Sequence, residues 1–541
     1  LSIQSRDARP DVESAFAQVL AWQGVGTLLE SIWRDTRRIV VTRQGAPPAA
    51  WVELKAVEHA IGRGLLGTAA AGGAPDMAAL QTTRTRLTGD LERAFPTLAA
   101  ARAPGRASRV SVCRALRASK AALLDFVVYQ RLEATGVESV RTYDVFALIP
   151  SGDDCTLTRR AVGSAQGVDA EVNDFRDAVA AASRCGEGAC ASADARTRAA
   201  MTVLGERLLG PFEPSLKGVA EIWVVPDGRL GEVPFAALLH GGRFAIESWV
   251  IRALPFPAAA VLAAGGEGSG AFVAGDLDYG SLSQAPRLAS CDGRGCDNDP
   301  APPPLEIAWA RRAGGVCGYG GMWTSLIPTE AAPVATLLAQ SLKGVVLATG
   351  DNASEDVVAA ALTGKRFVHL ATHGFFSPPG TCARSADLTD ERGVDPMRLS
   401  ALVLSGANAP GPTTARDGLL TARDIADLSL AGTEVVALSA CETGRGTNLT
   451  GEGALGLARA FGVAGVGTTI ASLWEVPNAE SSELFTEFYA RLLEPSGRLS
   501  PAAALRQAQL TLIARLRADE GEAPIARWAA FVPLVARNLT P

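Results

Sequence analysis

The sequence lacks the features that mark a membrane protein or a nucleic-acid-binding protein. No apolar run approaches the roughly 18 residues that a membrane-spanning helix needs. Lysine and arginine total 51 against 57 aspartates and glutamates, which gives a net charge of −6. The basic residues form no stripe of the kind that follows a phosphate backbone. We therefore expect neither a membrane segment nor direct binding of nucleic acid.

Cysteine is also scarce, with nine in 541 residues, and the odd count leaves at least one thiol free. The first residues show no basic region followed by an apolar one, so we expect no signal peptide and a reducing cytoplasm. Cys185 and Cys190, like Cys291 and Cys296, have four residues between them, a spacing that permits zinc. Because no histidine accompanies these pairs and both lie in predicted loops, we expect neither zinc nor disulfides there, and no cofactor elsewhere.

What is present is the composition of a large globular protein. Hydrophobic residues make up 48% of the chain and charged residues 20%. The length predicts two to four domains. Apolar residues at helical spacing predict a helical region over residues 1–110, and mixed strand and helix patterns predict an α/β subdomain over 111–215. A longer α/β domain is predicted over 216–541.

Short apolar runs alternate with helical segments from residue 216 onward. This pattern predicts a mostly parallel sheet flanked by helices. The segments 291–304 and 377–398 are polar and contain proline and glycine, so we expect mobile surface loops there. The predicted strands are EIWVVP, AFVAG, GVVLATG, RFVHLAT, ALVLSG, EVVALSA and GTTIASLW, and helices are expected at 330–342, 354–363, 453–462 and 479–493.

Two of the four histidines occur in the run VHLATHG, which includes His369 and His373. The run reads as a buried strand, with His373 at its end, before Gly374. A catalytic base belongs at a strand end, where it faces a site, whereas His369 lies within the strand and is expected to support the core or the site.

A second run, VVALSACETG, is again a buried strand, and it ends at Cys441. A nearby imidazole would lower the pKa of this thiol and raise the fraction of reactive thiolate. Cys441 follows His373 by 68 positions, with one apolar run, ALVLSG, between them. A single cysteine is most often a small buried hydrophobe, but two strand ends of this kind favour a Cys–His site at one edge of the sheet.

Gly451, Gly453 and Gly456 fit the pattern of a dinucleotide-binding turn. Such a turn must open directly from a strand end. Here a loop separates the glycines from the strand that ends at Cys441. The glycines are therefore expected to give the loop freedom and to allow close helix packing, with no nucleotide site.

The motifs HLATHGFF and LSACETGRG resemble the two signatures of CHAT domains, caspase-like domains that often follow tetratricopeptide (TPR) helices. The resemblance extends over residues 216–541 and includes IWVVPDGRLGEVPFAAL, LIPTEAAPVATLL, GEGALGLARAFGVAGVGTTIASLWEVPN, ALRQAQLTL and RWAAFVPL. A cysteine some tens of residues after a histidine is also the chain order of caspase-like enzymes. The segment AFAQVLAWQGVGTLLESIW is similar to the helices between TPR repeats and a CHAT domain, so repeats are expected before Leu1.

The resemblance implies the caspase/separase fold and assigns roles to single residues. His373 would be the base and Cys441 the nucleophile, with the N–H groups of Gly374 and Cys441 as oxyanion donors. The strand after the nucleophile would line a pocket for the substrate residue before the scissile bond, namely Ser472, Leu473, Trp474 and Glu475. Where many relatives have an acidic residue a little further on, this chain has Asn478, which speaks against a simple preference for basic residues.

These expectations combine into a cysteine endopeptidase that cleaves a partner protein. Relatives are usually gated, so we expect an activator, a protein or a ligand, to act through the upstream helices, with 377–398 as a candidate gate. Bacterial relatives act in defence or regulated cell death. Residues 111–215 would then be an inactive caspase-like partner subdomain. The alternative is a catalytically silent scaffold with the same fold, which signals by binding other proteins.

Overall fold

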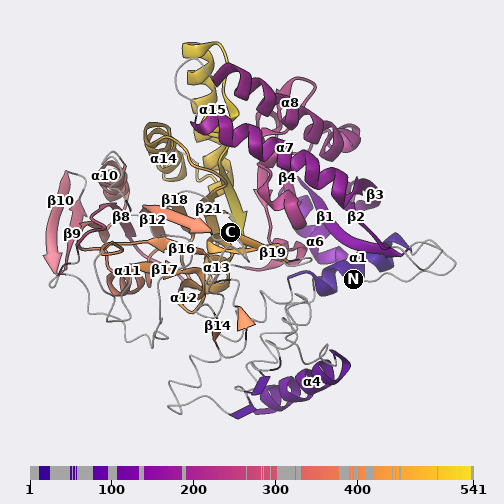
Figure 1. Ribbon diagram of the computed structural model, residues 1–541, viewed down its shortest axis with the longest axis horizontal. Coiled ribbons are helices and arrows are strands. Elements are labelled where there is room, and N and C mark those ends of the chain that lie inside the picture. The colour runs from indigo at the N-terminus through magenta and orange to yellow at the C-terminus, as the bar shows by residue number, and fades with distance from the viewer. Residues whose placement is uncertain are drawn as a thin grey trace.

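The structure is a computed structural model, shown in Figure 1, and it describes most of the chain from residue 107 onward. The described residues are 11–24, 49–50, 53–54, 57, 77–94, 107–132, 139–184, 190–263, 265–281, 283, 286–292, 294–300, 323, 330–376, 389–390, 393–394, 397, 400–408, 418–440, 443–444, 446–449, 453–495 and 497–537.

One large sheet organises the described residues and contains thirteen strands. In spatial order these are β10 (Gly295–Pro300), β9 (Arg287–Asp292), β11 (Val345–Gly350), β8 (Ala271–Leu277), β12 (Phe367–Ala371), β18 (Val435–Ser439), β21 (Thr468–Ser472), β22 (Phe531–Val535), β7 (Val250–Ala253), β4 (Glu221–Val225), β1 (Ala121–Leu132), β2 (Ser139–Ser151) and β3 (Asp154–Ser164).

Nine of the thirteen strands form two parallel blocks joined at one antiparallel pair, and the edge strands β10 and β9 at one side and β2 and β3 at the other pair antiparallel. Strands β11, β8, β12, β18 and β21 form one parallel block, and β22, β7, β4 and β1 form the other. The pair β21–β22 is antiparallel and joins them. The expected mostly parallel sheet is confirmed. Because β1 pairs directly with β4, the sheet is continuous across residue 215, and the division into domains at that position stays a prediction.

Helices cover both faces of this sheet, as Figure 1 shows. The larger core lies under α7, α8, α10, α14 and α15. The opposite face is covered by α11, α12 and α13 over the first block and by α1 and α6 over the second. The helices are α1 (Val12–Trp22), α4 (Met77–Ala94), α6 (Arg109–Ala118), α7 (Ala165–Arg184), α8 (Cys190–Leu208), α9 (Ala245–Ser248), α10 (Ala331–Ser341), α11 (Glu355–Leu362), α12 (Ala422–Ala426), α13 (Leu457–Ala464), α14 (Asn478–Leu492), α15 (Pro501–Glu520) and α16 (Ile525–Trp528).

The central strands are apolar on both faces because both faces are covered. Along β18, Val435 and Ala437 join the core under α10 and α14, while Val436 and Leu438 join the core under α13. Every residue of β12 is buried, including His369. Alternate side chains therefore fix both strands between two helical layers, which holds their carboxyl ends at one edge.

The apolar run ALVLSG does not enter the large sheet. Its strand β16 (Ser400–Val403) pairs antiparallel with β13 (His373–Phe376) and β17 (Leu419–Thr421) in a separate three-stranded sheet. As a result, β12 and β18 are direct neighbours. The remaining two-stranded sheets are β5 (Leu239–His240) with β6 (Arg243–Phe244), β14 (Thr389–Asp390) with β15 (Gly393–Val394), and β19 (Gly446–Leu449) with β20 (Gly453–Gly456).

The prediction of a loop at 291–304 is wrong for Cys291–Asp292 and Gly295–Pro300, which lie in strands. Those residues end β9 and form β10, and a disulfide joins Cys291 to Cys296 across the hairpin. Cys190 is also disulfide-bonded. The expectation of no disulfide is therefore wrong for Cys190, Cys291 and Cys296, and cysteines bonded in this way offer no thiolate to a zinc ion. Cys185 lies outside the described residues.

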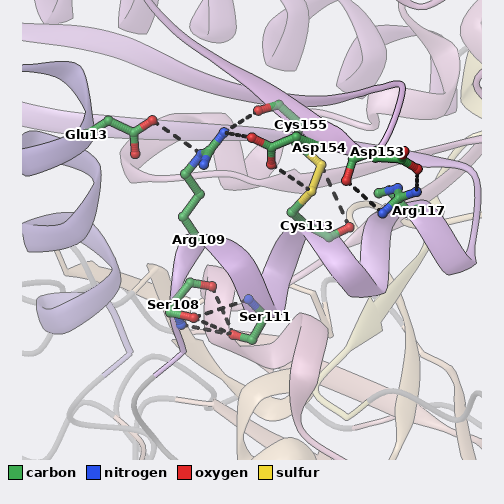
Figure 2. Close-up of a disulfide and its surroundings, with 9 residues drawn as sticks. All are labelled: Glu13, Ser108, Arg109, Ser111, Cys113, Arg117, Asp153, Asp154 and Cys155. Atoms are coloured by element: carbon green, nitrogen blue, oxygen red, sulfur yellow. Dashed lines mark hydrogen bonds and ion pairs between the residues drawn. A yellow bond between two sulfur atoms is a disulfide. The ribbon is translucent and has the colours of Figure 1, made fainter.

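A further disulfide, Cys113–Cys155, fastens α6 to the edge strand β3 (Figure 2). Around it Arg109 contacts Asp154 at 3.0 Å and Glu13 of α1 at 3.3 Å. The first helix of the described chain is thus tied to the sheet through the same cluster. No helix among the described residues is both long enough and apolar enough to cross a membrane. Most of the expected gate at 377–398 lies outside the described residues.

Candidate functional site

The predicted base, His373, lies at the carboxyl edge of the large sheet. It is the first residue of β13, two positions after β12 ends, because Thr372 turns the chain out of the sheet. The N–H of Thr372 donates to the carbonyl oxygen of Ser439 at 3.2 Å, and its hydroxyl donates to the carbonyl oxygen of Val403. Thr372 thereby joins the ends of β12, β18 and β16 and fixes the point at which His373 emerges.

Two aromatic rings frame the imidazole of His373. The ring centroids of Tyr279 and Trp323 each lie 5.3 Å from the imidazole centroid. Asn408 holds both: its amide nitrogen donates to the carbonyl oxygen of Trp323, its amide oxygen accepts from the N–H of Trp323, and its own N–H donates to the carbonyl oxygen of Tyr279. The half-buried imidazole is therefore oriented by side chains that are themselves fixed.

The strand that leads to the predicted nucleophile is the direct parallel neighbour of the strand that leads to His373. Ala371 of β12 is in register with Ser439 of β18. Since parallel strands end at the same edge of a sheet, the residues that follow them emerge together. Cys441 itself lies outside the described residues, as does Glu442.

The described residues on both sides of Cys441 are anchored to the end of β21. The hydroxyl of Ser472 donates to the carbonyl oxygen of Ala440, and the N–H of Ser472 donates to Thr443 Oγ1 at 3.0 Å. The N–H of Gly444 donates to the carbonyl oxygen of Ser472 at 2.8 Å. The described residues directly before and after this segment are thus fixed to the end of β21.

Replacing the fully buried Thr443 by valine is expected to lower the free energy of unfolding by about 1–3 kcal/mol. Valine keeps the shape but leaves the buried N–H of Ser472 without an acceptor. Urea unfolding would measure the loss. The control is Thr202→Val, which removes an exposed hydroxyl in α8 and should cost less than about 0.5 kcal/mol. Equal stability of the two variants would contradict the anchoring role of Thr443.

The predicted pocket residues differ in how accessible they are. Ser472 is buried in the anchor just described, and Leu473 is buried with its carbonyl oxygen bound by Arg176. Trp474 is also buried, its indole N–H donates to the carbonyl oxygen of Ala526, and its ring packs on Phe175. Glu475 is exposed. The assignment of these residues to a substrate pocket stays a prediction, and only Glu475 offers a peptide its side chain.

The predicted oxyanion donor Gly374 is the second residue of β13 and pairs with Leu402 of β16. It lies next to His373 and is buried. Its role in binding a developing oxyanion stays a prediction, since the other predicted donor, the N–H of Cys441, lies outside the described residues.

Below this edge lies a buried polar cluster that spans four elements. Glu330, at the start of α10, has its Oε1 3.0 Å from Nε2 of His369, although the two are not aligned as a straight hydrogen bond. Its Oε2 accepts a hydrogen bond from the hydroxyl of Ser439 at 2.9 Å. Tyr489 Oη lies 3.4 Å from Nδ1 of His369. His369 is fully buried and Glu330 is 7% exposed, so this carboxylate is almost completely removed from water.

Asp276 lies at the same edge, at the end of β8. The register of β8 against β11 shifts between Ala348 and Gly350, which marks a β-bulge. Asp276 has a φ of 54°, a left-handed conformation that is uncommon for a residue with a side chain. Burial, and then the nearby Glu330, raise the pKa of its carboxyl. Bulges and strained residues concentrate beside functional sites.

Glu330 and Asp276 were not identified from the sequence. Glu330 begins the apolar helical segment EAAPVATLL, and a lone acidic residue there is also typical of a helix N-terminus. Asp276 follows the apolar run AFVAG, as an ordinary loop residue would. Neither pattern indicates that the carboxylate turns inward toward a site.

Of the glycine-rich run after Cys441, Gly453 and Gly456 lie in β20, which pairs with β19 and leads into α13. It is therefore part of a hairpin and not a turn that opens from a strand of the large sheet. Within the described part of the chain, no three histidine, cysteine, aspartate or glutamate side chains come together in a way that could hold a metal ion.

Comparison with known proteins gives one family match and two curated relatives. A family model described as the CHAT domain matches residues 198–536. Tetratricopeptide repeat protein 28 of Homo sapiens is 27% identical over 216 residues, and its counterpart in Mus musculus is 27% identical over 215 residues. Each alignment covers 38% of this chain and 8% of the relative, so the chain spans only a small part of either protein.

Among solved structures, the Arg-specific cysteine proteinase gingipain R is similar with a TM-score of 0.35 and 11% identity, covering 69% of this chain and 75% of that chain. Separase in the Saccharomyces cerevisiae separase–securin complex is similar with a TM-score of 0.39 and 9% identity, covering 79% of this chain and 30% of that chain.

Proposed function

The chain belongs to the CHAT domain family, and we propose that it is a cysteine endopeptidase in which Cys441 is the nucleophile and His373 the base. The observation that carries the proposal is the pairing of β12 with β18, in register from Phe367–Val435 to Ala371–Ser439. The hydrogen bond from Thr372 to Ser439 continues this pairing past the strand ends. It supports a dyad because it brings the two chain segments out of the sheet side by side.

In the proposed mechanism, the imidazole of His373 takes the proton of the Cys441 thiol, and the thiolate attacks the carbonyl carbon of the scissile peptide bond. The tetrahedral oxyanion would be bound by the N–H groups of Gly374 and Cys441. His373 then gives its proton to the leaving amine, and the C–N bond breaks to leave a thioester. A water molecule, deprotonated by His373, attacks the thioester, releases the carboxylic acid and restores the thiol.

The substrate of this reaction would be a partner protein cut at a limited site. We further propose that an activator acts through the helices before residue 110 and that residues 377–398 serve as the gate. The packing of α1 on the large sheet supports this route, because Phe16 of α1 contacts Phe146 of β2 with ring centroids 5.7 Å apart. A role in bacterial defence or regulated cell death also stays a proposal, and it would be tested by identifying the partner.

A catalytically silent scaffold is the alternative, and thiol labelling separates the two functions. In the enzyme, Cys441 is expected to react with iodoacetamide at roughly pH 6–7, below the pKa of about 8.5 of an ordinary thiol. Mass spectrometry of the labelled peptide would give the rate at each pH. Cys441→Ala should remove that label and leave the labelling of other cysteines unchanged.

If Cys441 is alkylated no faster than an ordinary exposed thiol, with a midpoint near pH 8.5 even when an activator is bound, the enzyme is excluded and the scaffold remains. The same experiment should be repeated with a bound activator once one is known. A second readout is cleavage of a co-expressed partner, which the wild-type chain should perform and the Cys441→Ala chain should not.

A further inference from the structure

The Glu330 carboxylate contacts both strands that lead to the proposed dyad. On the nucleophile side it accepts a hydrogen bond from Ser439, two residues before Cys441. On the base side it contacts His369, four residues before His373. One side chain from α10 therefore connects the two strands below the point where Cys441 and His373 leave the sheet.

This cluster lies in apolar surroundings, where a buried charge destabilises the fold unless it is paired. His369 is fully buried, and its ring meets those of Phe485 and Tyr489 of α14 edge to face, with centroids 5.0 Å and 5.7 Å apart. A carboxylate placed among apolar and aromatic groups destabilises the fold unless it is paired and hydrogen-bonded. An apolar side chain at residue 330 would fill the same space without the free-energy cost of burying a carboxylate. The presence of Glu330 is therefore better explained by a role in the site than by a contribution to stability.

We propose that Glu330 is a positioning residue of the dyad: by holding Ser439 of the nucleophile strand and His369 of the base strand, its carboxylate sets the distance and angle at which His373 faces Cys441. The proposal rests on the proposed function, because it needs a reacting pair to position. It requires no direct contact between Glu330 and the substrate.

Groups from four elements face Glu330: His369 from β12, Ser439 from β18, Tyr489 from α14 and Asp276 from β8. Burial, and then Glu330, raise the pKa of both Tyr489 and Asp276. Tyr489 and Asp276 thus lie close enough to Glu330 for its carboxylate to affect both groups.

The test uses the full chain and iodoacetamide as the probe of Cys441. Glu330→Gln keeps the size of the side chain but removes its charge. A loosened dyad is expected to lower the alkylation rate of Cys441 near pH 6.5 by about 10-fold or more and to move the pH midpoint up toward that of an ordinary thiol. A purely electrostatic effect has the opposite sign, because loss of a nearby negative charge stabilises the thiolate and moves the midpoint down.

Two further variants separate positioning from folding. Ser439→Ala removes only the link to the nucleophile strand without changing any charge, and it should move the midpoint in the same direction as Glu330→Gln. Glu480→Gln is the matched control: Glu480 is a buried carboxylate paired with Arg527, outside the cluster, and its loss should leave the alkylation profile unchanged. Urea unfolding of each variant reports how much stability it has lost.

An upward shift in Glu330→Gln and Ser439→Ala, with none in Glu480→Gln, supports the proposal. If Glu330→Gln does not fold, Ser439→Ala decides. A reactive wild-type thiol with an unchanged or downward-shifted midpoint in the deciding variant overturns the positioning role and leaves the enzyme standing. A wild-type thiol that reacts like any exposed thiol overturns both proposals, since no dyad is then present to position.

Discussion

His373→Ala is expected to lower turnover of a peptide substrate by about 10²- to 10⁴-fold, the range that a positioned general base and acid contributes. The imidazole acts three times in the proposed cycle, on the thiol, the leaving amine and the hydrolytic water. The two aromatic side chains that frame the ring, Tyr279 and Trp323, are poor bases near neutral pH and cannot replace it.

The measurement needs a substrate, which an unbiased peptide library can supply. Peptides cut by the wild-type chain but not by Cys441→Ala define the substrate set, and kcat/KM for one of them is then measured in each variant. The control is His240→Ala. His240 is a histidine of β5 that contacts Glu206 and Glu213 at 2.9 Å and 2.7 Å, outside the site.

We expect His240→Ala to keep full turnover. The base assignment of His373 would be contradicted if His373→Ala kept more than about a tenth of wild-type turnover, which is above the range given for general acid–base catalysis. Equal losses in the two variants would instead point to a general loss of structure, and urea unfolding of both would identify that case.

The sequence predicts the central strands well because their composition has one physical reading. The run VVAL, apolar at every position and bounded by Glu434 and Ser439, is typical of a strand that is buried on both faces in a covered parallel sheet. The same pattern does not say which sheet a strand joins. The run ALVLSG was correctly expected to be a strand, but β16 pairs with β13 and β17, and that choice depends on backbone partners distant in the chain.

The site was predictable where a residue follows a strand and unpredictable where it acts through a distant partner. The position of His373 after a strand follows from local patterns, but the direct pairing of β12 with β18 does not, because the run ALVLSG was expected as a strand between them. The Glu330 cluster does not, because its members are brought together from α10, β12, β18 and α14 by the packing of helices on the sheet. The polar composition of the segment after residue 291 led to the wrong prediction of a loop, because the edge hairpin β9–β10 is itself polar. The disulfide that closes this hairpin is not specified by cysteine spacing alone.

Removing the Cys113–Cys155 disulfide is expected to lower the free energy of unfolding by about 4 kcal/mol. The two cysteines are 42 positions apart, so the bond closes a long loop and restricts the unfolded chain strongly. Both sulfur-bearing residues are buried, and replacing both by alanine leaves no free thiol behind. Urea unfolding without reductant would measure the loss.

The second disulfide is the matched control. Cys291 and Cys296 are only 5 positions apart, so the same loop-entropy argument gives about 2 kcal/mol for their removal. A larger loss from Cys291→Ala/Cys296→Ala than from Cys113→Ala/Cys155→Ala would contradict the argument. The longer loop also encloses α6 and the strands β1 and β2, so its opening should release the edge of the sheet on which α1 packs.

The disulfide bonds also bear on the cellular compartment in which the protein acts. Cys113, Cys155, Cys291, Cys296 and Cys190 are disulfide-bonded, and Cys190 requires a sixth cysteine as its partner. Of nine cysteines, at most three then remain as thiols, and Cys441 must be one of them for the dyad to react. Disulfides persist in oxidising compartments and are rare in the cytosol, so their state in the isolated protein bears on the compartment, which stays a prediction. Alkylation of the protein as isolated, before and after reduction, should label no more than three and then nine cysteines. Nine labelled cysteines before reduction would show that the protein contains no disulfide. That result would agree with a reducing compartment and would contradict the stabilisation predicted for both bonds.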